Sequence, residues 1–190
     1  VGLAGAWRDE QLAVCDPHGR RLGTVERAAV RPLGIATQAV HLVGQAPDGR
    51  FWVQQRAFDK PNDPGLWDTL MGGMISSADT LDSALARETW EEAGLHLTEL
   101  ADLHYGGRLH ICRPARDGNG AGYVSEYIDW YCCTVPEGIV PVNQDGEVEC
   151  FALMDGQELL RQMQQDQFTL EAALIQAALL DVRSGTSSAT

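Results

Sequence analysis

The chain of 190 residues predicts a single domain, and its apolar fraction of 44% is sufficient for a buried core. Its 14 Lys and Arg residues against 27 Asp and Glu residues give a formal net charge of −13. This surplus of acid argues against a nucleic-acid polymer or an anionic membrane surface as a partner, because both are bound through clustered cationic side chains. It does not exclude a small anionic substrate, since a bound divalent cation can reverse the charge of a site locally.

Neither a membrane-spanning segment nor a secretory leader is expected. The longest uncharged stretch, residues 34–47, is too short to cross a bilayer, and the first eight residues form no hydrophobic signal region. The cysteines are odd in number, scattered and without a C-x-x-C pair, which predicts reduced thiols in a cytoplasmic protein. They are Cys15, Cys112, Cys132, Cys133 and Cys150.

The first third of the chain predicts two β-hairpins. Segments 12–15 and 22–25 flank the turn sequence Asp-Pro-His-Gly, and segments 39–43 and 51–55 flank Ala-Pro-Asp-Gly.

A loop and then a helix follow. Residues 57–66 are rich in Asp, Pro, Asn and Gly, which predicts a loop, and a helical period runs over residues 80–93. Thr80 suits its N-cap, Asp82 its first turn and Gly94 the position after its end. The side chains expected to face a core are Leu81, Ala84, Leu85 and Thr89.

The second half predicts three strands and two helices. The strands are expected over residues 102–112, 123–134 and 147–153, and the helices over 156–164 and 169–182. Asp155 and Thr169 are their expected caps. A core-facing stripe is expected on the last helix at Leu170, Ala173, Leu174, Ala177 and Leu180.

Three glutamates share one face of the helix over residues 80–93. Glu88, Glu91 and Glu92 are spaced i, i+3 and i+4. Like charges at this spacing destabilise a helix by roughly a few tenths of a kcal/mol per pair, which suggests a countercharge on that face. Hard oxygen ligands of this kind suit Mg²⁺ or Mn²⁺. The alternative is a merely solvated acidic face, and the surrounding residues decide between the two.

These glutamates belong to a longer pattern, Gly73-x5-Asp79-x7-Arg87-Glu88-Thr89-x-Glu91-Glu92-x-Gly94-Leu95. It resembles the Nudix box, Gly-x5-Glu-x7-Arg-Glu-aliphatic-x-Glu-Glu-x-Gly-aliphatic. Asp79 departs from the box by shortening the reach of the loop carboxylate, and Thr89 departs from it by replacing a larger apolar residue.

The resemblance extends beyond the box, over residues 7–183. Segments such as Trp7-Arg8-Asp9-Glu10 and Asp145-Gly146-Glu147-Val148-Glu149 look like one Nudix group, found alone in bacteria and yeasts and fused to thiamine pyrophosphokinase in some fungi. Members of that group carry an extra N-terminal domain. The expected division is therefore an N-terminal extension at 1–33, a remnant of that domain, followed by a Nudix domain at 34–183 and a disordered tail at 184–190. The resemblance implies an α/β fold, an α/β/α sandwich with a mixed sheet, with an N-terminal β-hairpin added.

The resemblance also implies a diphosphatase, a hydrolase similar to MutT-type enzymes. Its substrate would be a small organic diphosphate, either a thiamine diphosphate derivative or a nucleoside diphosphate compound, cleaved by water attack at phosphorus. The Mg²⁺ ligands would be Glu88, Glu91, Glu92 and the Gly72 carbonyl. Arg87 would orient these carboxylates and Asp79 could bond Arg87 across the loop, while Glu88 could instead help to activate the water.

Other roles are distributed over the rest of the chain. A general base could come from Glu126, Glu147 or Glu149, although each could also be a solvent-facing strand carboxylate; Glu147 and Glu149 alternate with Val148 and are expected on one strand face. Arg56 and Lys60 could bind the diphosphate. Alternative anion contacts are Arg108, Arg113 and Arg116. Six aromatic side chains could stack on a heterocycle of the substrate, although packing in the core is the stronger expectation for each. They are Trp52, Trp67, Tyr105, Tyr123, Trp130 and Tyr131.

Two other functions remain open. One is a non-catalytic Nudix module that only binds a ligand, although such modules usually lose box glutamates that are all present here. The other is an isomerase similar to isopentenyl diphosphate isomerase, which would use a Cys on the strand before the glycines and a His beside them. The segment Thr69-Leu70-Met71-Gly72-Gly73 contains neither. A homodimer is possible, since dimerisation is common in the superfamily.

Overall fold

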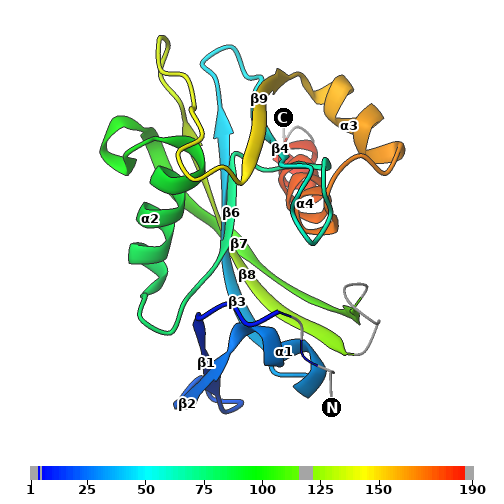
Figure 1. Cartoon of the computed structure of the whole chain (residues 1–190). Helices are drawn as coiled ribbons and strands as arrows, with labels where there is room; N and C mark the ends of the chain where they lie inside the picture. Colours follow the sequence, from blue (N-terminus) through cyan, green and yellow to red (C-terminus); the bar gives the residue numbers. More distant parts are fainter. Residues whose placement is uncertain (1–3, 5, 116–121, 187–190) are drawn as a thin grey trace.

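A seven-stranded mixed sheet with helices on both faces organises the chain, and a separate two-stranded sheet lies near the N-terminus (Figure 1). The computed structural model describes residue 4 and residues 6–115 and 122–186, with side chains described as far as residue 180. The strands are β1 (Gln11–Cys15), β2 (Arg21–Glu26), β3 (Thr37–Gln45), β4 (Phe51–Arg56), β5 (Trp67–Asp68), β6 (Met71–Met74), β7 (Ala101–Pro114), β8 (Tyr123–Thr134) and β9 (Val148–Met154). The α-helices are α1 (Arg27–Leu33), α2 (Leu81–Ala93), α3 (Gly156–Gln164) and α4 (Leu170–Thr186), and η1 (Leu97–Glu99) is a 3₁₀ turn.

The large sheet has the order β5-β4-β3-β8-β7, with β6 also paired to β3 and β9 to β4. Only β3 and β8 are parallel among the described pairs. Their register runs from Thr37 opposite Glu126 to Gln45 opposite Thr134. Residues directly opposite in neighbouring strands project to the same face, so Glu126 and Thr37 meet on one side of the sheet.

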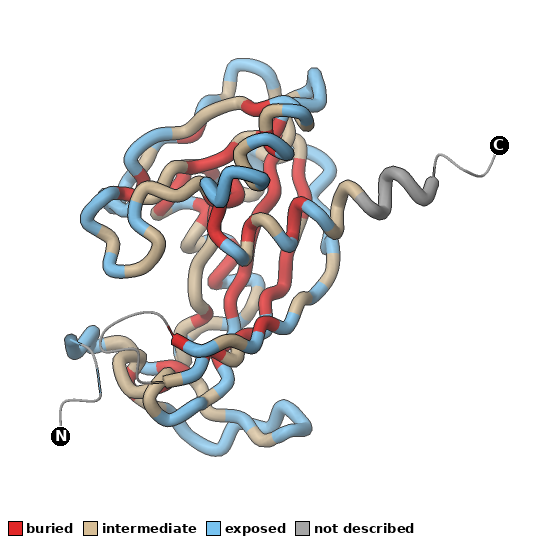
Figure 2. The backbone as a smooth tube through the Cα atoms, turned by 90° about the vertical axis from the view of Figure 1, so that its right-hand side faces the viewer, coloured by how far each residue is buried: buried red, intermediate tan, exposed pale blue. Residues whose placement is uncertain are grey.

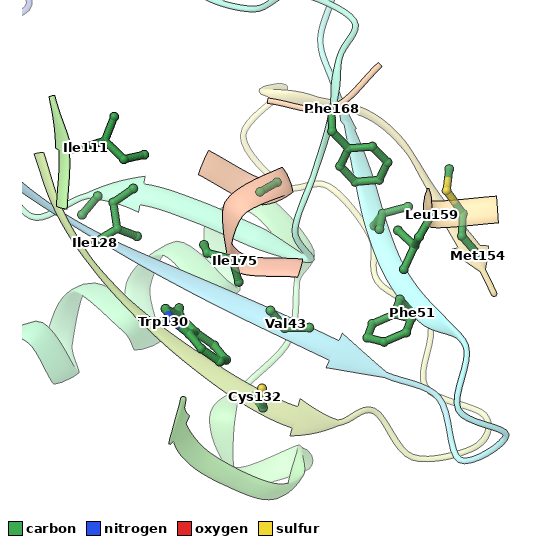
Figure 3. Packing of buried hydrophobic residues seen from close by; sticks show 13 residues of the cluster. Val43, Phe51, Ile111, Ile128, Trp130, Cys132, Met154, Leu159, Phe168 and Ile175 are labelled. Atoms are coloured by element: carbon green, nitrogen blue, oxygen red, sulfur yellow. The ribbon is translucent and has the colours of Figure 1, made fainter. Parts of the chain in front are cut away.

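Two apolar clusters hold the helices on the sheet. One packs α3 and α4 on one face, where Phe168, Leu159 and Ile175 contact strand residues such as Val43 and Trp130 (Figure 3). The other packs α2 on the opposite face through Ala84, Leu85 and Ala93 together with Leu42 and Met71. The most buried part of the backbone is therefore the middle of the central strands (Figure 2).

Helix α2 begins and ends at residues that the sequence predicted. The Thr80 side chain accepts a hydrogen bond from the Ser83 amide, and the Ser83 hydroxyl accepts one from the Thr80 amide. Gly94 takes the left-handed conformation, with φ 63°, that ends the helix. Ala84, Leu85 and Thr89 are buried, which confirms the predicted core face.

Both predicted hairpins form, but the second is shorter than a simple hairpin. β1 and β2 pair over their whole length, whereas β3 and β4 pair only at Gly44–Trp52 and Gln45–Phe51. Further along β3, strand β6 takes the pairing positions, from Ala39–Met74 to Leu42–Met71. This insertion brings the glycine pair of β6 into the sheet.

The apolar stripe predicted on the last helix is wrong at Leu170 and Leu174, although Ala173 does pack against the core. The buried face of α4 carries Ala172 and Ile175, while Leu170 and Leu174 are 45% and 40% exposed. The start of the helix fixes this rotation, because Thr169 donates its backbone N–H to the Trp67 carbonyl at 2.9 Å. Helix α4 extends to Thr186, and residues 187–190 of the predicted tail lie outside the described residues.

Two further findings bear on the sequence expectations. Within the described residues, no helix has the length and apolar content to cross a bilayer. Cys132 and Cys133, both in β8, are buried, whereas Cys15, Cys112 and Cys150 are exposed.

Candidate functional site

A cavity of about 690 Å³ opens beside α2 and β6. It brings together segments from β3, β4, β6, α2, β8 and α4 and the loops between them. Nine of the residues that the sequence predicts to be catalytic, metal-binding or substrate-binding line it, namely Arg56, Lys60, Gly72, Arg87, Glu88, Glu91, Glu92, Glu126 and Glu147.

The three glutamates of α2 reach the cavity at different depths. Glu92 is 2% exposed, and its Oε2 accepts hydrogen bonds from Gln54 Nε2 at 2.8 Å and from the Gly72 amide at 2.9 Å. The Glu88 side chain is 13% exposed, and the Glu91 side chain is 41% exposed. The helix therefore presents a gradient from a buried to a solvent-facing carboxylate.

The glycine pair makes room for this carboxylate wall. A Cβ placed on Gly73 would lie 2.3 Å from the carboxylate carbon of Glu88, and one on Gly72 would lie 2.4 Å from Cε1 of His41. Both distances are far below contact range, so neither position tolerates a side chain without movement. Gly72 and Gly73 thus let Glu88 approach β6 from one face and His41 from the other.

Arg87 holds the acidic groups around it. It donates to Asp79 Oδ2 from Nε at 3.2 Å and from Nη2 at 2.9 Å, and to Glu91 Oε2 from Nη1 at 2.7 Å. Its Nη2 also lies 3.0 Å from Glu88 Oε1. The contact with Asp79 is the one expected of a structural loop carboxylate, so the shorter Asp side chain does reach Arg87.

Burial shifts the pKa of two of the glutamates upward. Burial raises the pKa of Glu92 to about 8, against the pull of Lys60 and of its two hydrogen bonds. Burial also raises the pKa of Glu88 to about 7, where the charges of Glu91 and Glu147 add to it and Arg87 opposes it. Both groups are thus poised to exchange a proton for a cation near neutral pH.

Lys60 and Glu147 also line the cavity, and Lys60 Nζ donates a hydrogen bond to Glu147 Oε2. Burial alone would raise the pKa of Glu147, but this bond and the charges of Lys60, Arg27 and Arg56 hold it below its ordinary value. Glu147 lies one residue before β9 begins, and Glu149 lies on that strand away from the cavity. The expectation that both belong to one strand face is therefore wrong, because the β4–β9 pairing is irregular between Gln55 and Arg56.

Arg56 is anchored by the loop that follows it. Its Nε and Nη2 donate to the Asn62 carbonyl at 3.3 Å and 3.1 Å, and its Nη1 lies 3.5 Å from Asp68 Oδ2. These bonds fix the guanidinium group in the wall of the cavity.

The inner wall of the cavity is also acidic. Glu126 is 7% exposed and accepts a hydrogen bond from Thr37 Oγ1 at 2.7 Å. Burial raises the pKa of Glu171 on α4, and the charges of Asp68 and Glu126 raise it further. Arg113 Nη2 lies 3.5 Å from Glu171 Oε1, which places one cation in this wall.

Several sequence candidates lie elsewhere. Arg108 pairs with Asp129 through bonds of 3.0 and 2.8 Å and does not line the cavity, and Arg116 lies outside the described residues. None of the six aromatic candidates lines the cavity, and Trp130 packs in the core as expected (Figure 3).

Other lining residues were not anticipated from the sequence. They are Arg8, Glu10, Arg27, Arg31, His41, Asp68, Asp145 and Glu171. Asp68 follows Trp67 and Asp145 lies two residues before Glu147, but neither belongs to a periodic pattern that would predict where its side chain points. The others come from segments that only the fold brings to the cavity.

The donor set fits a hard divalent cation in its chemistry. Three carboxylates of one helix face line the cavity, and Gly73 leaves room for that of Glu88. Within the described residues, no three His, Cys, Asp or Glu side chains already stand in an arrangement that could hold a metal. Arg87, Gln54 and the Gly72 amide hold the glutamates instead, so metal binding would require these partners to be exchanged.

A family model for the NUDIX domain matches residues 36–174. The uncharacterized protein YJR142W of Saccharomyces cerevisiae is 27% identical over 97% of this chain and 57% of its own length. Nudix hydrolase 20, chloroplastic, of Arabidopsis thaliana is 32% identical over 69% of this chain and 35% of its own length. An isopentenyl-diphosphate Delta-isomerase of Streptomyces avermitilis is 34% identical over 48% of this chain and 47% of its own length. The chain thus spans about a third to just over half of these curated relatives.

The fold is shared with solved structures of low sequence identity. The crystal structure of DR0079 from Deinococcus radiodurans aligns with a TM-score of 0.70 at 18% identity, over 89% of this chain and 99% of that one. This likeness supports the mixed α/β architecture.

Proposed function

The chain belongs to the Nudix family, and from this premise we propose that it is a metal-dependent hydrolase of small organic diphosphates. One observation carries the proposal. The box glutamates of α2 and the cationic Arg56 and Lys60 line a single cavity, although they come from separate segments of the sequence.

The metal site would be built from α2 and β6. We infer that Glu88, Glu91 and Glu92 hold Mg²⁺, with the Gly72 carbonyl as a further ligand and Mn²⁺ as a possible substitute. When bound, the ion supplies the positive charge that neutralises diphosphate oxygens and makes water a better nucleophile. Arg87 then acts as a positioning residue, because its guanidinium group bonds Asp79 and Glu91 at once.

Arg56 and Lys60 would bind the diphosphate, and Glu147 would take the proton. Arg56 is fixed toward the cavity by Asn62, and Lys60 can leave Glu147 to bind a phosphate oxygen. Such an exchange frees Glu147 to accept the proton of the attacking water. We favour Glu147 over Glu126 as the base outside the helix, because its charge acts on Glu88, whereas Glu126 is buried and bonded to Thr37.

The identity of the organic group attached to the diphosphate depends on the polar residues that line the rest of the cavity. A thiamine diphosphate derivative remains the first candidate and a nucleoside diphosphate compound the second. Since no Trp or Tyr lines the described part of the cavity, recognition of a ring would depend on polar groups such as Glu126, Glu171 and Thr169.

An isomerase is the less favoured alternative. His41 does stand beside the glycine pair, contributed by β3 rather than by the segment before Gly72. No cysteine, however, lines the cavity within the described residues, so the second group expected of such an isomerase is missing there.

Phosphate release from a panel of organic diphosphates, measured with Mg²⁺ and with a chelator, tests the proposal. The double variant Glu91→Gln/Glu92→Gln should abolish metal-dependent release while the protein stays folded. Glu137→Gln, an exposed acid away from the cavity, is the matched control and should retain activity. Metal-dependent release that survives in the double variant would overturn the site assignment, and absence of release from every compound would favour a binding module.

A further inference from the structure

An N-terminal segment outside the matched domain reaches the cavity. The family model begins at residue 36, and residues 7–33 contain the separate β1–β2 sheet and α1, at the lower end of the molecule in Figure 1. Four side chains of this segment nevertheless line the cavity, namely Arg8, Glu10, Arg27 and Arg31.

Hydrogen bonds attach this segment to two loops that border the cavity. Toward the box loop, the Ser77 amide donates to the Gln11 carbonyl at 2.7 Å, and Arg21 Nη1 donates to the Ser77 carbonyl at 2.8 Å. Toward the loop between β4 and β5, Arg31 Nη1 donates to Asn62 Oδ1 at 3.4 Å. The segment is therefore fixed where its arginines face the site.

Its charge is opposite to that of the remaining wall. The segment lines the cavity with three arginines and one glutamate, whereas the rest of the lining has four cationic side chains against ten acidic ones. Those four cations already form ion pairs with acidic residues of the same lining. A diphosphate entering this cavity meets repulsion that additional guanidinium groups would offset.

Two of the three arginines are accessible for a ligand. Arg8 is exposed, and within the described residues its guanidinium group has no hydrogen bond or ion pair. Arg27 pairs with Glu10 at 2.7 Å, but both side chains are about a third exposed, so the pair is weak and exchangeable. The charge of Arg27 also acts on Glu147, which places it on the Lys60 side of the cavity.

We propose that Arg8, Arg27 and Arg31 form an anion subsite for the terminal phosphate of the substrate, so that residues 7–33 are part of the substrate site. The inference rests on the proposed diphosphatase function and narrows its substrate class. Three guanidinium groups match the doubly charged end phosphate of a diphosphate monoester better than a diphosphate that bridges two organic groups.

Binding of inorganic diphosphate, measured by calorimetry in the presence of Mg²⁺, tests the subsite without turnover. Arg8→Gln, Arg27→Gln and Arg31→Gln should each raise the Kd about tenfold, since each removes a charge-assisted contact. Arg20→Gln is the matched control, because Arg20 lies in the same segment, pairs with Asp16 and does not line the cavity. Thermal melts verify that each variant is folded, and Arg27→Lys should restore part of the affinity.

Glu10→Gln separates a ligand-binding role from a structural one. It removes the acid that competes for Arg27, so diphosphate should bind about two- to fivefold more tightly. If the arginines merely brace the fold, the same change would leave affinity unchanged or lower it.

Turnover distinguishes failure of this inference from failure of the proposed function. Unchanged Kd and KM in all three arginine variants, with hydrolysis intact, would overturn the subsite and leave the hydrolase standing. If the unmodified protein hydrolyses no compound but binds diphosphate, and the arginine variants lose this binding, the subsite is supported and the proposed hydrolase activity is overturned. Failure of the unmodified protein to bind diphosphate at about 1 mM would also overturn the subsite.

Discussion

The carboxylate of Glu88 lies directly against the backbone of Gly73. A Cβ on Gly73 would come within 2.3 Å of the carboxylate carbon and 2.6 Å of each oxygen. Because β6 is held in the sheet by β3 and α2 by its own apolar cluster, a side chain at Gly73 would displace the Glu88 carboxylate rather than either backbone. The glycine that opens the box is therefore required sterically, as the space into which a box carboxylate fits.

Replacement of Gly73 should consequently cost activity more than stability. Gly73→Ala displaces the Glu88 carboxylate, and kcat/KM should fall about a hundredfold, since small misplacements of reacting groups have effects of that size. Gly156→Ala is the control, because nothing lies within 4 Å of a Cβ at Gly156. Steady-state kinetics and thermal melts check both variants, and full activity of Gly73→Ala would contradict the assigned role of Glu88.

The bond between Lys60 and Glu147 predicts a pH effect with a definite sign. Because Lys60 helps to hold the pKa of Glu147 below its ordinary value, Lys60→Met should raise that pKa. The acidic limb of the kcat/KM profile should then move to higher pH while KM rises about tenfold. Glu149→Gln, next to the same turn but outside the cavity, should move neither. An acidic limb that stays in place in Lys60→Met would contradict Glu147 as the base.

A direct probe of Lys60 is available, because it is the only lysine in the sequence. Reductive methylation with carbon-13 formaldehyde labels its Nζ and the α-amine alone. The Nζ resonance should shift when inorganic diphosphate is added with Mg²⁺, as Lys60 exchanges Glu147 for phosphate. The resonance of the methylated α-amine serves as the internal reference. If calorimetry shows that diphosphate binds but the resonance of the methyl groups on Nζ does not shift, the exchange is contradicted.

The raised pKa values of Glu92 and Glu88 predict how metal-free stability depends on pH. In the folded protein the pKa is raised to about 8 for Glu92 and to about 7 for Glu88, whereas the ordinary pKa of a glutamate is 4.5. Their contribution to stability is therefore complete below pH 4.5 and is lost as the pH rises through the folded values. Melting temperatures of Glu92→Gln and the unmodified protein, followed across this range, should show a flatter decline in the variant.

Mg²⁺ should act in the opposite direction, because it requires ionised carboxylates. The rise in melting temperature on adding Mg²⁺ should be larger at about pH 8 than at about pH 5. Glu137→Gln should retain both the decline and the metal effect. A Mg²⁺ effect that does not depend on pH, or a Glu92→Gln variant with an unchanged slope, would contradict the assignment.

Asp79 and Arg87 should behave as one unit. Asp79→Asn removes the negative charge to which the Arg87 guanidinium group is hydrogen-bonded. Activity should therefore fall by a similar factor in Asp79→Asn, in Arg87→Gln and in the double variant. A double-mutant cycle on kcat/KM measures this coupling, for which we expect about 1–2 kcal/mol. Independent, additive losses would show that Asp79 does not act through Arg87.

The local features of the site could be predicted from sequence. Helix α2 carries its own cap at Thr80, its own end at Gly94 and a spacing that places Glu88 and Glu92 together, so nothing beyond residues 80–94 is needed to predict it. The loop over residues 57–66 follows from its turn-forming residues in the same way.

What remained hidden depends on contacts between distant segments. Helix α1 has seven residues and contains Pro32, which is too little for a periodic signal, yet it places Arg27 and Arg31 in the cavity. The rotation of α4 is set by Thr169 bonding Trp67, so Glu171 faces the cavity and Leu174 does not. Neither contact can be derived from residue patterns along one segment.

Hydrolysis of an organic diphosphate in oxygen-18 water, followed by mass spectrometry of both products, tests the central claim most directly. Water attack at phosphorus predicts one oxygen-18 atom in a phosphate product, only with the divalent metal present and not in Glu91→Gln/Glu92→Gln. Label in the organic alcohol, or an isomerised substrate that carries no label, would contradict the account.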